Sequence, residues 1–230
     1  MPDHIHWIET EDRLLLAKRL AQQVGDWLKT ALQEQDRASL AVSGGKTPLN
    51  FFSALSQLDL PWSRVDITLA DERWVDTDHD ASNERLVRKH LLCHQASEAR
   101  FVGLKVDTAR PEQGLELCEQ RLDSIHWPLD VLVLGMGTDG HTASLFPGTQ
   151  GLGEALASER RCHAIEPLDA PHPRMTLTRK ALAGARHKAL QIEGDEKLAV
   201  LEEALEYLDR VEVMPIRAFL QQEISVFWAP

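Results

Sequence analysis

The sequence predicts one doubly wound α/β domain over residues 1–230, with a mostly parallel sheet flanked by helices. Short apolar runs typical of buried parallel strands alternate with amphipathic helical segments. Two of these runs, Ala38–Val42 and Val131–Leu134, lead directly into glycine-containing turns. No repeat or long linker divides the chain, and a hydrophobic content of 43% is sufficient for one core.

Composition excludes several classes of function. A formal net charge of −11 disfavours nucleic acid and anionic membrane surfaces as partners, because both require a basic field. Cys93, Cys118 and Cys162 form no CxxC pair, so neither a disulfide framework nor a zinc cluster is expected. The sequence shows no signal peptide and no apolar run near the ~18 residues of a membrane span. We therefore expect a soluble cytoplasmic protein.

The first elements form a helix followed by a strand, a turn and a second helix. Thr10 is the expected cap of a helix in which apolar residues recur at helical spacing from residue 16 to residue 31. The strand Ala38–Val42 then runs into the turn Ser43–Pro48. Thr47 is the expected cap of the next helix, with Pro48 at its first position, where the missing N–H has no cost.

The same alternation continues through the middle of the chain. Val65–Ala70 is expected to be a strand that leads into Asp71, Glu72 and Arg73. Ser82 is the expected cap of a helix over Asn83–Leu92, followed by a short strand at Arg100–Gly103. Apolar residues from position 115 to position 125 then predict another amphipathic helix before the Val131–Leu134 strand.

The second half of the chain is less regular but still predicts alternating elements. In order, these are a short helix near Leu152–Ala157, a strand at Cys162–Ile165, an alternating segment at Met175–Thr178, a strand at His187–Ile192, a helix at Glu196–Leu208 and a last strand at Ile224–Trp228 that could close the sheet.

Two glycine-rich turns resemble nucleotide-binding motifs without satisfying them. Gly135–Gly140 matches GxGxxG, but Pro147 interrupts the crossover helix that a dinucleotide fold requires. Gly45, Lys46 and Thr47 resemble the end of a P-loop, but Leu40 stands where its first glycine is required. Nucleotide binding by either route is therefore not expected.

The Ser43–Thr47 turn has two interpretations. Successive small residues expose N–H groups at a helix N-terminus, and Lys46 adds a positive charge, so the turn suits a phosphate. The same residues also suit a tight connection between a strand and a helix.

Asp139 and His141 lie at the predicted carboxyl end of a central strand, where open α/β sheets usually bind ligands. They could form a base and its orienting acid, a metal-binding pair or a polar turn; their spacing and the lack of a third ligand make metal the weakest choice. An imidazole can take a proton from water and return it to a leaving oxygen. Asp71 and Arg73 follow a neighbouring strand, and Arg174 and Lys197 are further candidate cations.

Six segments together resemble the glucosamine-6-phosphate isomerase/6-phosphogluconolactonase family. They are SGGKTP (Ser43–Pro48), DERWV (Asp71–Val75), SNERLVRKHLL (Ser82–Leu92), LGMGTDGHTASLFPG (Leu134–Gly148), PRMTLT (Pro173–Thr178) and EGDEK (Glu193–Lys197). The resemblance implies the fold of glucosamine-6-phosphate deaminase and hydrolysis of 6-phospho-D-glucono-1,5-lactone in the pentose phosphate pathway, with no metal or organic cofactor. We expect a monomer whose partner is this small phosphosugar lactone.

The resemblance also distinguishes the lactonase from two alternatives. Deaminase relatives carry a glutamate five residues after the histidine, where this chain has Phe146, so the lactonase is favoured over an amino-sugar phosphate deaminase. A phosphosugar sensor is also possible on this fold, but no helix-turn-helix or basic patch accompanies it here.

The matching positions imply a role for each candidate site residue. His141 activates water and Asp139 orients or stabilises its imidazole. The expected phosphate contacts are Ser43, Gly44, Gly45, Thr47, Arg174 and Lys197, with Lys46 beside them. The other expected substrate contacts are Asp71, Arg73, Gly135 and Gly137.

Overall fold

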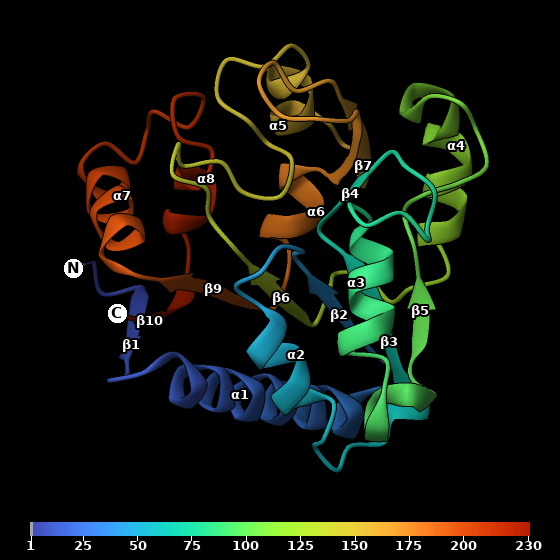
Figure 1. The fold of residues 1–230 in the computed structure, drawn as a ribbon, viewed down its shortest axis with the longest axis vertical. Helices are drawn as coiled ribbons and strands as arrows, with labels where there is room; N and C mark the ends of the chain where they lie inside the picture. The colour runs from blue at the N-terminus through green and yellow to red at the C-terminus, as the bar shows by residue number, and fades with distance from the viewer. Residues whose placement is uncertain (1) are drawn as a thin grey trace.

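A seven-stranded parallel sheet forms the centre of the computed structural model, which describes residues 2–230 (Figure 1). Its strand order is β1-β10-β9-β6-β2-β3-β5. The strands are β1 (Ile5–Glu9), β2 (Ala38–Val42), β3 (Val65–Leu69), β5 (Arg100–Val102), β6 (Val131–Leu134), β9 (His187–Glu193) and β10 (Ile224–Ala229). The doubly wound α/β class predicted from the sequence is confirmed.

The chain reverses its direction across the sheet between β2 and β6. The strands β3 and β5 extend the sheet on one side of β2, and β6 then returns to pair with β2 on the other side. In open α/β sheets, a crevice forms outside the carboxyl ends of the two strands at such a switch point. The turns after β2 and β6 therefore face a common crevice.

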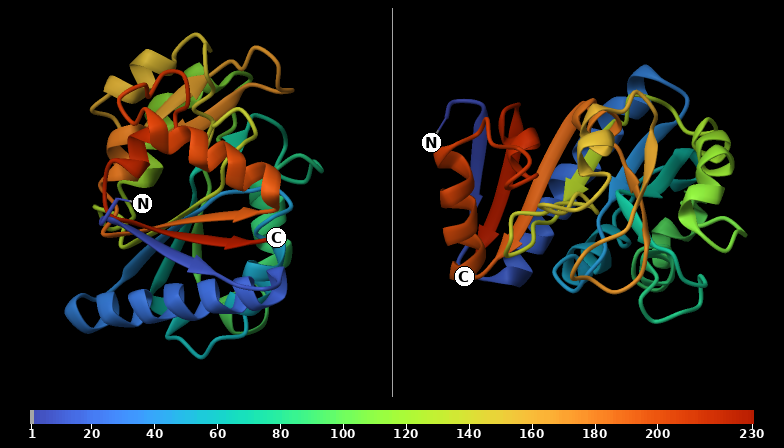
Figure 2. Two further views of the ribbon diagram at one scale, coloured as in Figure 1. Left: turned by 90° about the vertical axis from the view of Figure 1, so that its left-hand side faces the viewer. Right: turned by 90° about the horizontal axis from the view of Figure 1, so that it is seen from above.

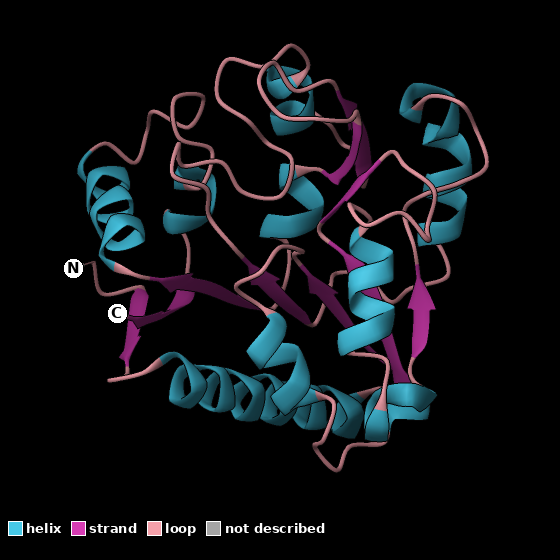
Figure 3. Ribbon diagram, in the orientation of Figure 1, coloured by secondary structure: helices cyan, strands magenta, loops and turns pink. Residues whose placement is uncertain are grey.

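Helices cover both faces of the sheet (Figures 2 and 3). Helix α1 runs beneath one face and packs against α2, whereas α7 lies over the opposite face. The helices are α1 (Arg13–Glu34), α2 (Leu49–Leu55), α3 (Asn83–His90), α4 (Pro111–Leu122), α5 (Leu152–Ala157), α6 (Arg179–Ala183), α7 (Asp195–Glu206) and α8 (Arg217–Leu220), with 3-10 turns η1 (Trp62–Arg64) and η2 (His94–Glu98). Across residues 2–230, none of these helices has the length and apolar character needed to cross a membrane.

A second, antiparallel sheet was not expected from the sequence. It consists of β4 (Asp71–Arg73), β8 (Arg174–Leu177) and β7 (Cys162–Ile165), in the order β4-β8-β7. Its register pairs Arg73 with Arg174 and Asp71 with Thr176. This small sheet therefore brings residues that are about a hundred positions apart in sequence to one side of the crevice.

Several sequence predictions were wrong in detail. Thr10 does not cap α1; the Asp12 side chain does so by accepting from the backbone N–H of Leu15 at 2.8 Å. Thr47 does not cap α2 either, because the helix begins one residue later with Pro48 at the cap. The last strand, β10, does not close the sheet, since β1 pairs with it on the outer side.

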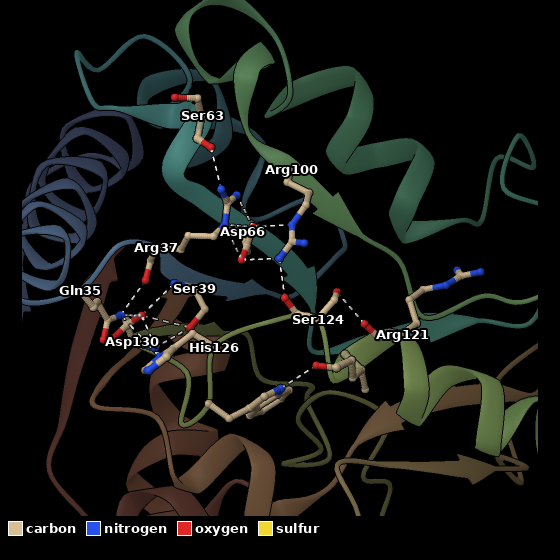
Figure 4. Close-up of polar contacts among 12 residues, drawn as sticks. Gln35, Arg37, Ser39, Ser63, Asp66, Arg100, Arg121, Ser124, His126 and Asp130 are labelled. Atoms are coloured by element: carbon tan, nitrogen blue, oxygen red, sulfur yellow. Dashed lines mark hydrogen bonds and ion pairs between the residues drawn. The ribbon is translucent and has the colours of Figure 1, made fainter.

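Two buried carboxylates join the amino ends of the central strands (Figure 4). Asp66 in β3 accepts hydrogen bonds from Arg37 and Arg100, with closest distances of 2.6 Å to each. Burial would raise the pKa of Asp66, but these two guanidinium groups outweigh it and lower the pKa. Asp130 accepts from the Ser39 backbone N–H at 2.8 Å, which ties β6 to β2. These contacts lie at the opposite end of the sheet from the crevice and fix the register of its strands.

Candidate active site

The crevice at the carboxyl ends of β2 and β6 contains a cavity of about 360 Å³. This volume lies within the range of roughly 300–1,000 Å³ that is usual for small-molecule sites. Its walls come from the turn after β2, the loop after β6, strands β4 and β8, and the start of α7. The cavity therefore lies where the topological switch predicts a ligand.

The Ser43–Thr47 turn forms one wall of the cavity. The Ser43 N–H donates to the Val133 carbonyl at 3.1 Å, which fixes the turn to β6. Gly45 has a φ of +100°, a conformation that favours glycine. Within residues 2–230, the N–H groups of residues 44–47 donate no hydrogen bond. Donors that are free at the start of a helix form a suitable site for an anion.

His141 and Asp139 interact directly. The Nδ1 atom of His141 lies 2.6 Å from Oδ1 of Asp139, and the His141 backbone N–H donates to the same oxygen at 3.1 Å. Burial would raise the pKa of Asp139, but these donors lower it below its usual value. Because an ionised carboxylate only accepts, Nδ1 carries the proton and Nε2 is left free to accept one.

Glycine at position 137 makes room for this pair. A Cβ there would lie 2.1 Å from His141 Nδ1 and 2.5 Å from Asp139 Oδ1. The Gly137 N–H donates to the His141 carbonyl at 2.8 Å, so the loop closes on itself around the imidazole. Gly137 thus serves to position the loop, in addition to lining the cavity.

Phe146 lies between the imidazole and a buried cation. Its ring centroid is 4.4 Å from that of His141, and the Arg174 guanidinium carbon lies 5.7 Å from it on a cation–π contact. The family resemblance implies a glutamate at this position in the deaminases. Here the neighbour of the imidazole is an apolar ring that cannot transfer protons.

Three cationic side chains line the cavity beside the anion-binding turn. Arg174 is buried, and this burial lowers its pKa, although the Asp71 carboxylate opposes the effect. Burial also lowers the pKa of Lys197, although the negative charges of Glu196 and Asp139 act to raise it. The Arg73 side chain donates to the Ala81 carbonyl at 2.8 Å. An anion in the cavity would offset the cost of burying these charges.

The structure brings the predicted site residues together. The turn residues from Ser43 to Thr47, the two glycines of the β6 loop, Asp71, Arg73, Arg174, Lys197 and His141 all line the cavity. Asp139 contacts His141 from behind and is not part of the lining. Lys46 is exposed at the rim.

Several further polar residues at the site were not predicted as site residues. Asn83, Gln191 and Glu193 line the cavity, and Ser144 is fully buried behind it. The Ser144 hydroxyl donates to Asp71 Oδ2 at 2.5 Å, so it anchors a carboxylate and is not exposed as a nucleophile. Asn83, Ser144 and Glu193 lie in segments that carry the family resemblance, but the sequence pattern assigned them no role, because their contacts with distant parts of the chain appear only in the folded structure.

Taken as a whole, the switch-point cavity defines an α/β protein with donors and cations suited to a small anion beside an imidazole able to transfer protons. Comparison with known proteins identifies its family. The chain belongs to the glucosamine-6-phosphate isomerases/6-phosphogluconolactonase family, whose model matches residues 11–228.

Individual relatives agree with this assignment. A 6-phosphogluconolactonase of Pseudomonas aeruginosa is 47% identical over 93% of this chain and 90% of that protein. The crystal structure of a 6-phosphogluconolactonase from Shewanella baltica OS155 has a TM-score of 0.97 at 44% identity, with both chains fully covered. A monomeric glucosamine-6-phosphate deaminase shares the fold, with a TM-score of 0.81 at 19% identity over 97% of each chain.

Proposed function

We propose that this protein hydrolyses 6-phospho-D-glucono-1,5-lactone to 6-phospho-D-gluconate in the oxidative branch of the pentose phosphate pathway. The observation that carries the proposal is that one cavity is lined by both the anion-binding turn and the His141 imidazole, which Asp139 orients. Lactonases of this family that are 47% and 44% identical to the chain support it.

The 6-phosphate binds to the turn and to the nearby cations. The free N–H groups of residues 44–47 and the side chains of Arg174 and Lys197 supply donors on one side of the cavity. Charge-assisted hydrogen bonds of this kind contribute on the order of 1.5–3 kcal/mol each. They allow a protein with a net charge of −11 to bind an anion.

His141 then acts as the general base. Its Nε2 takes a proton from water as the water oxygen bonds to the lactone carbonyl carbon, C1. The tetrahedral intermediate collapses, the bond between C1 and the ring oxygen breaks, and the imidazolium returns the proton to that oxygen. The ionised carboxylate of Asp139 stabilises the transient positive charge. The product is the open-chain acid, which loses its proton to solvent.

Arg73 is a candidate to stabilise the oxyanion, beside the loop N–H groups of Met136 and Thr138. The backbone N–H groups of Gly137 and Gly140 already donate to carbonyls of the same loop, and that of Gly135 donates to the Ser43 hydroxyl at 3.4 Å. The Arg73 guanidinium lines the cavity and lies in the strand next to that of Arg174. A fixed cation near the developing oxygen charge lowers the barrier without moving.

The proposed reaction needs no metal and no organic cofactor, and its only required partner is the phosphosugar lactone. We place it in the cytoplasm and assign it to one domain that acts as a monomer. The first alternative, deamination of an amino-sugar phosphate, lacks support because Phe146 replaces a proton-transferring group beside His141.

A paired assay tests this function. Glucose 6-phosphate is oxidised in a coupled reaction to supply the lactone, and acid release is compared with the spontaneous rate. A parallel reaction with glucosamine 6-phosphate is analysed for ammonia. We expect lactone hydrolysis well above the spontaneous rate and no ammonia; ammonia release without lactone hydrolysis would overturn the proposal.

A further inference from the structure

The buried side chain of Glu72 holds the start of helix α3 against strand β4. Glu72 is fully buried, and its carboxylate accepts the backbone N–H groups of Arg73, Asn83 and Glu84, each at 2.7 Å. The Ser82 hydroxyl donates to it at 3.1 Å. Three of these four donors, those of Ser82, Asn83 and Glu84, come from the start of α3 and fix its first turn relative to β4. Asn83, the first residue of that helix, therefore has a defined position beside the cavity.

The Asn83 side chain connects Asp71 to the anion-binding turn. Its Nδ2 donates to the Asp71 carbonyl at 2.8 Å and lies 3.5 Å from Asp71 Oδ1. Because both partners are acceptors, the nitrogen must face Asp71 and the oxygen must face the turn. Within residues 2–230, the buried Asn83 Oδ1 has no hydrogen-bond partner, and it lies against Gly44.

Gly44 provides the space for this amide. A Cβ built on Gly44 would lie 1.9 Å from Asn83 Oδ1 and 2.3 Å from Asn83 Cγ. Unlike Gly45, Gly44 has no positive φ, so its backbone conformation is open to any residue. The three heavy atoms nearest to a Cβ at position 44 all belong to the Asn83 amide, so Asn83 is the main reason that this position requires glycine.

Asp71 is held on two sides by residues from different parts of the chain, Ser144 and Asn83. Ser144, in the loop that carries His141, donates to one carboxylate oxygen at 2.5 Å. Asn83 lies beside the other oxygen and binds the main chain. The Asp71 carboxylate, the loop after β6 and the turn after β2 are thereby linked through buried contacts.

We propose that Asn83 is a positioning residue that sets the separation between the phosphate-binding turn and Asp71. This inference rests on the proposed function, because its consequence is the placement of the lactone. A phosphate bound at residues 44–47 fixes one end of the substrate, and the spacing set by Asn83 determines whether the ring reaches His141. In this role Asn83 acts through its contacts with Gly44 and Asp71.

A double-mutant cycle at these two positions tests the proposal. Asn83→Ala removes the link, and we expect kcat to fall about tenfold in the folded enzyme. Gly44→Ala drives a methyl group into the Asn83 amide, and we expect kcat/KM to fall by about 10²-fold, the loss that a misplacement of roughly 1 Å causes. In the double variant, Asn83→Ala vacates the space for the new methyl group. The kcat/KM of the double variant should therefore equal that of the single variant Asn83→Ala.

Gly153→Ala in α5 is the matched control. It has no heavy atom within 4 Å of the added Cβ and no positive φ, so it should have wild-type kinetics. Thermal unfolding of every variant reports the folded fraction. An Asn83 with a merely structural role would lower the melting temperature and leave kcat of the folded enzyme unchanged.

The outcomes separate the positioning role from the function itself. Losses that multiply in the double variant, or wild-type kcat in folded Asn83→Ala, would overturn the positioning role. If Gly44→Ala does not fold, the kcat of folded Asn83→Ala alone tests the positioning role. A wild-type protein that does not accelerate lactone hydrolysis would instead overturn the proposed function.

Discussion

Asp139→Asn separates the effect of charge from the effect of orientation at the imidazole. Both donors of His141, the ring Nδ1–H and the backbone N–H, point to the same oxygen of Asp139. An asparagine can retain both hydrogen bonds through its amide oxygen. The substitution therefore removes the negative charge while the imidazole keeps its orientation.

The expected loss follows from the geometry. Two unit charges about 4 Å apart attract by roughly 4 kcal/mol at an effective dielectric constant of about 20. The side chains of Asp139 and His141 are 51% and 32% exposed, so water screens part of this attraction. We take about 1.5–3 kcal/mol as the remaining stabilisation of the imidazolium, which corresponds to a loss of about 10–10² in kcat.

The assay is lactone hydrolysis at saturating substrate, corrected for the spontaneous rate. Asp139→Ala should be slower than Asp139→Asn, because it also frees the imidazole to rotate. Asp36→Asn, an exposed position remote from the cavity, is the matched control and should match wild type. A kcat for Asp139→Asn within twofold of wild type would refute the role of the charge.

Three further predictions concern binding and stability. Lys197→Ala should raise KM more than it lowers kcat, since the proposed contact with the phosphate would act in the ground and transition states alike; an unchanged KM would exclude this contact. Asp66→Asn should lower the free energy of unfolding in urea by about 2–3 kcal/mol at pH 7, because it leaves two arginines unpaired. Because the pKa of Asp66 is lower in the folded protein, its carboxylate stabilises the fold above the unfolded-state pKa, and this stabilisation is lost as pH falls through the folded-state pKa. The difference in free energy of unfolding between wild type and Asp66→Asn should therefore shrink from pH 7 toward about pH 2. An equal difference at pH 7 and at low pH would contradict this. Glu72→Gln should cost about 2–3 kcal/mol of stability, because its amide N–H₂ must face a buried backbone donor such as the Glu84 N–H; wild-type stability would show that these donors are satisfied otherwise.

Local sequence patterns predicted the parts of the fold that local physics determines. The run Val131–Leu134 is apolar throughout and lies at the centre of the sheet as β6, buried on both faces. The strand Ile5–Glu9 was missed because it mixes His6 and Glu9 with apolar residues and is specified by pairing with β10. The three residues of β4 were too short to signal a second sheet.

The same division applies to the site. The His141–Asp139 pair and the Ser43–Thr47 turn are contiguous in sequence, so their geometry could be anticipated. Asn83 and Ser144 could not be found in this way. Ser144 contacts Asp71 across 73 positions, and Asn83 meets Gly44 through tertiary packing between α3 and the turn. Only the folded arrangement shows that these residues support the site.

The central claim is that His141 transfers the proton during lactone hydrolysis, and the kinetics of His141→Ala test it most directly. Turnover of 6-phospho-D-glucono-1,5-lactone by the folded variant is measured against wild type, together with its affinity for 6-phosphogluconate. We predict a loss of about 10²–10⁴ in kcat with little change in affinity. Near-normal turnover by the folded variant would contradict this mechanism.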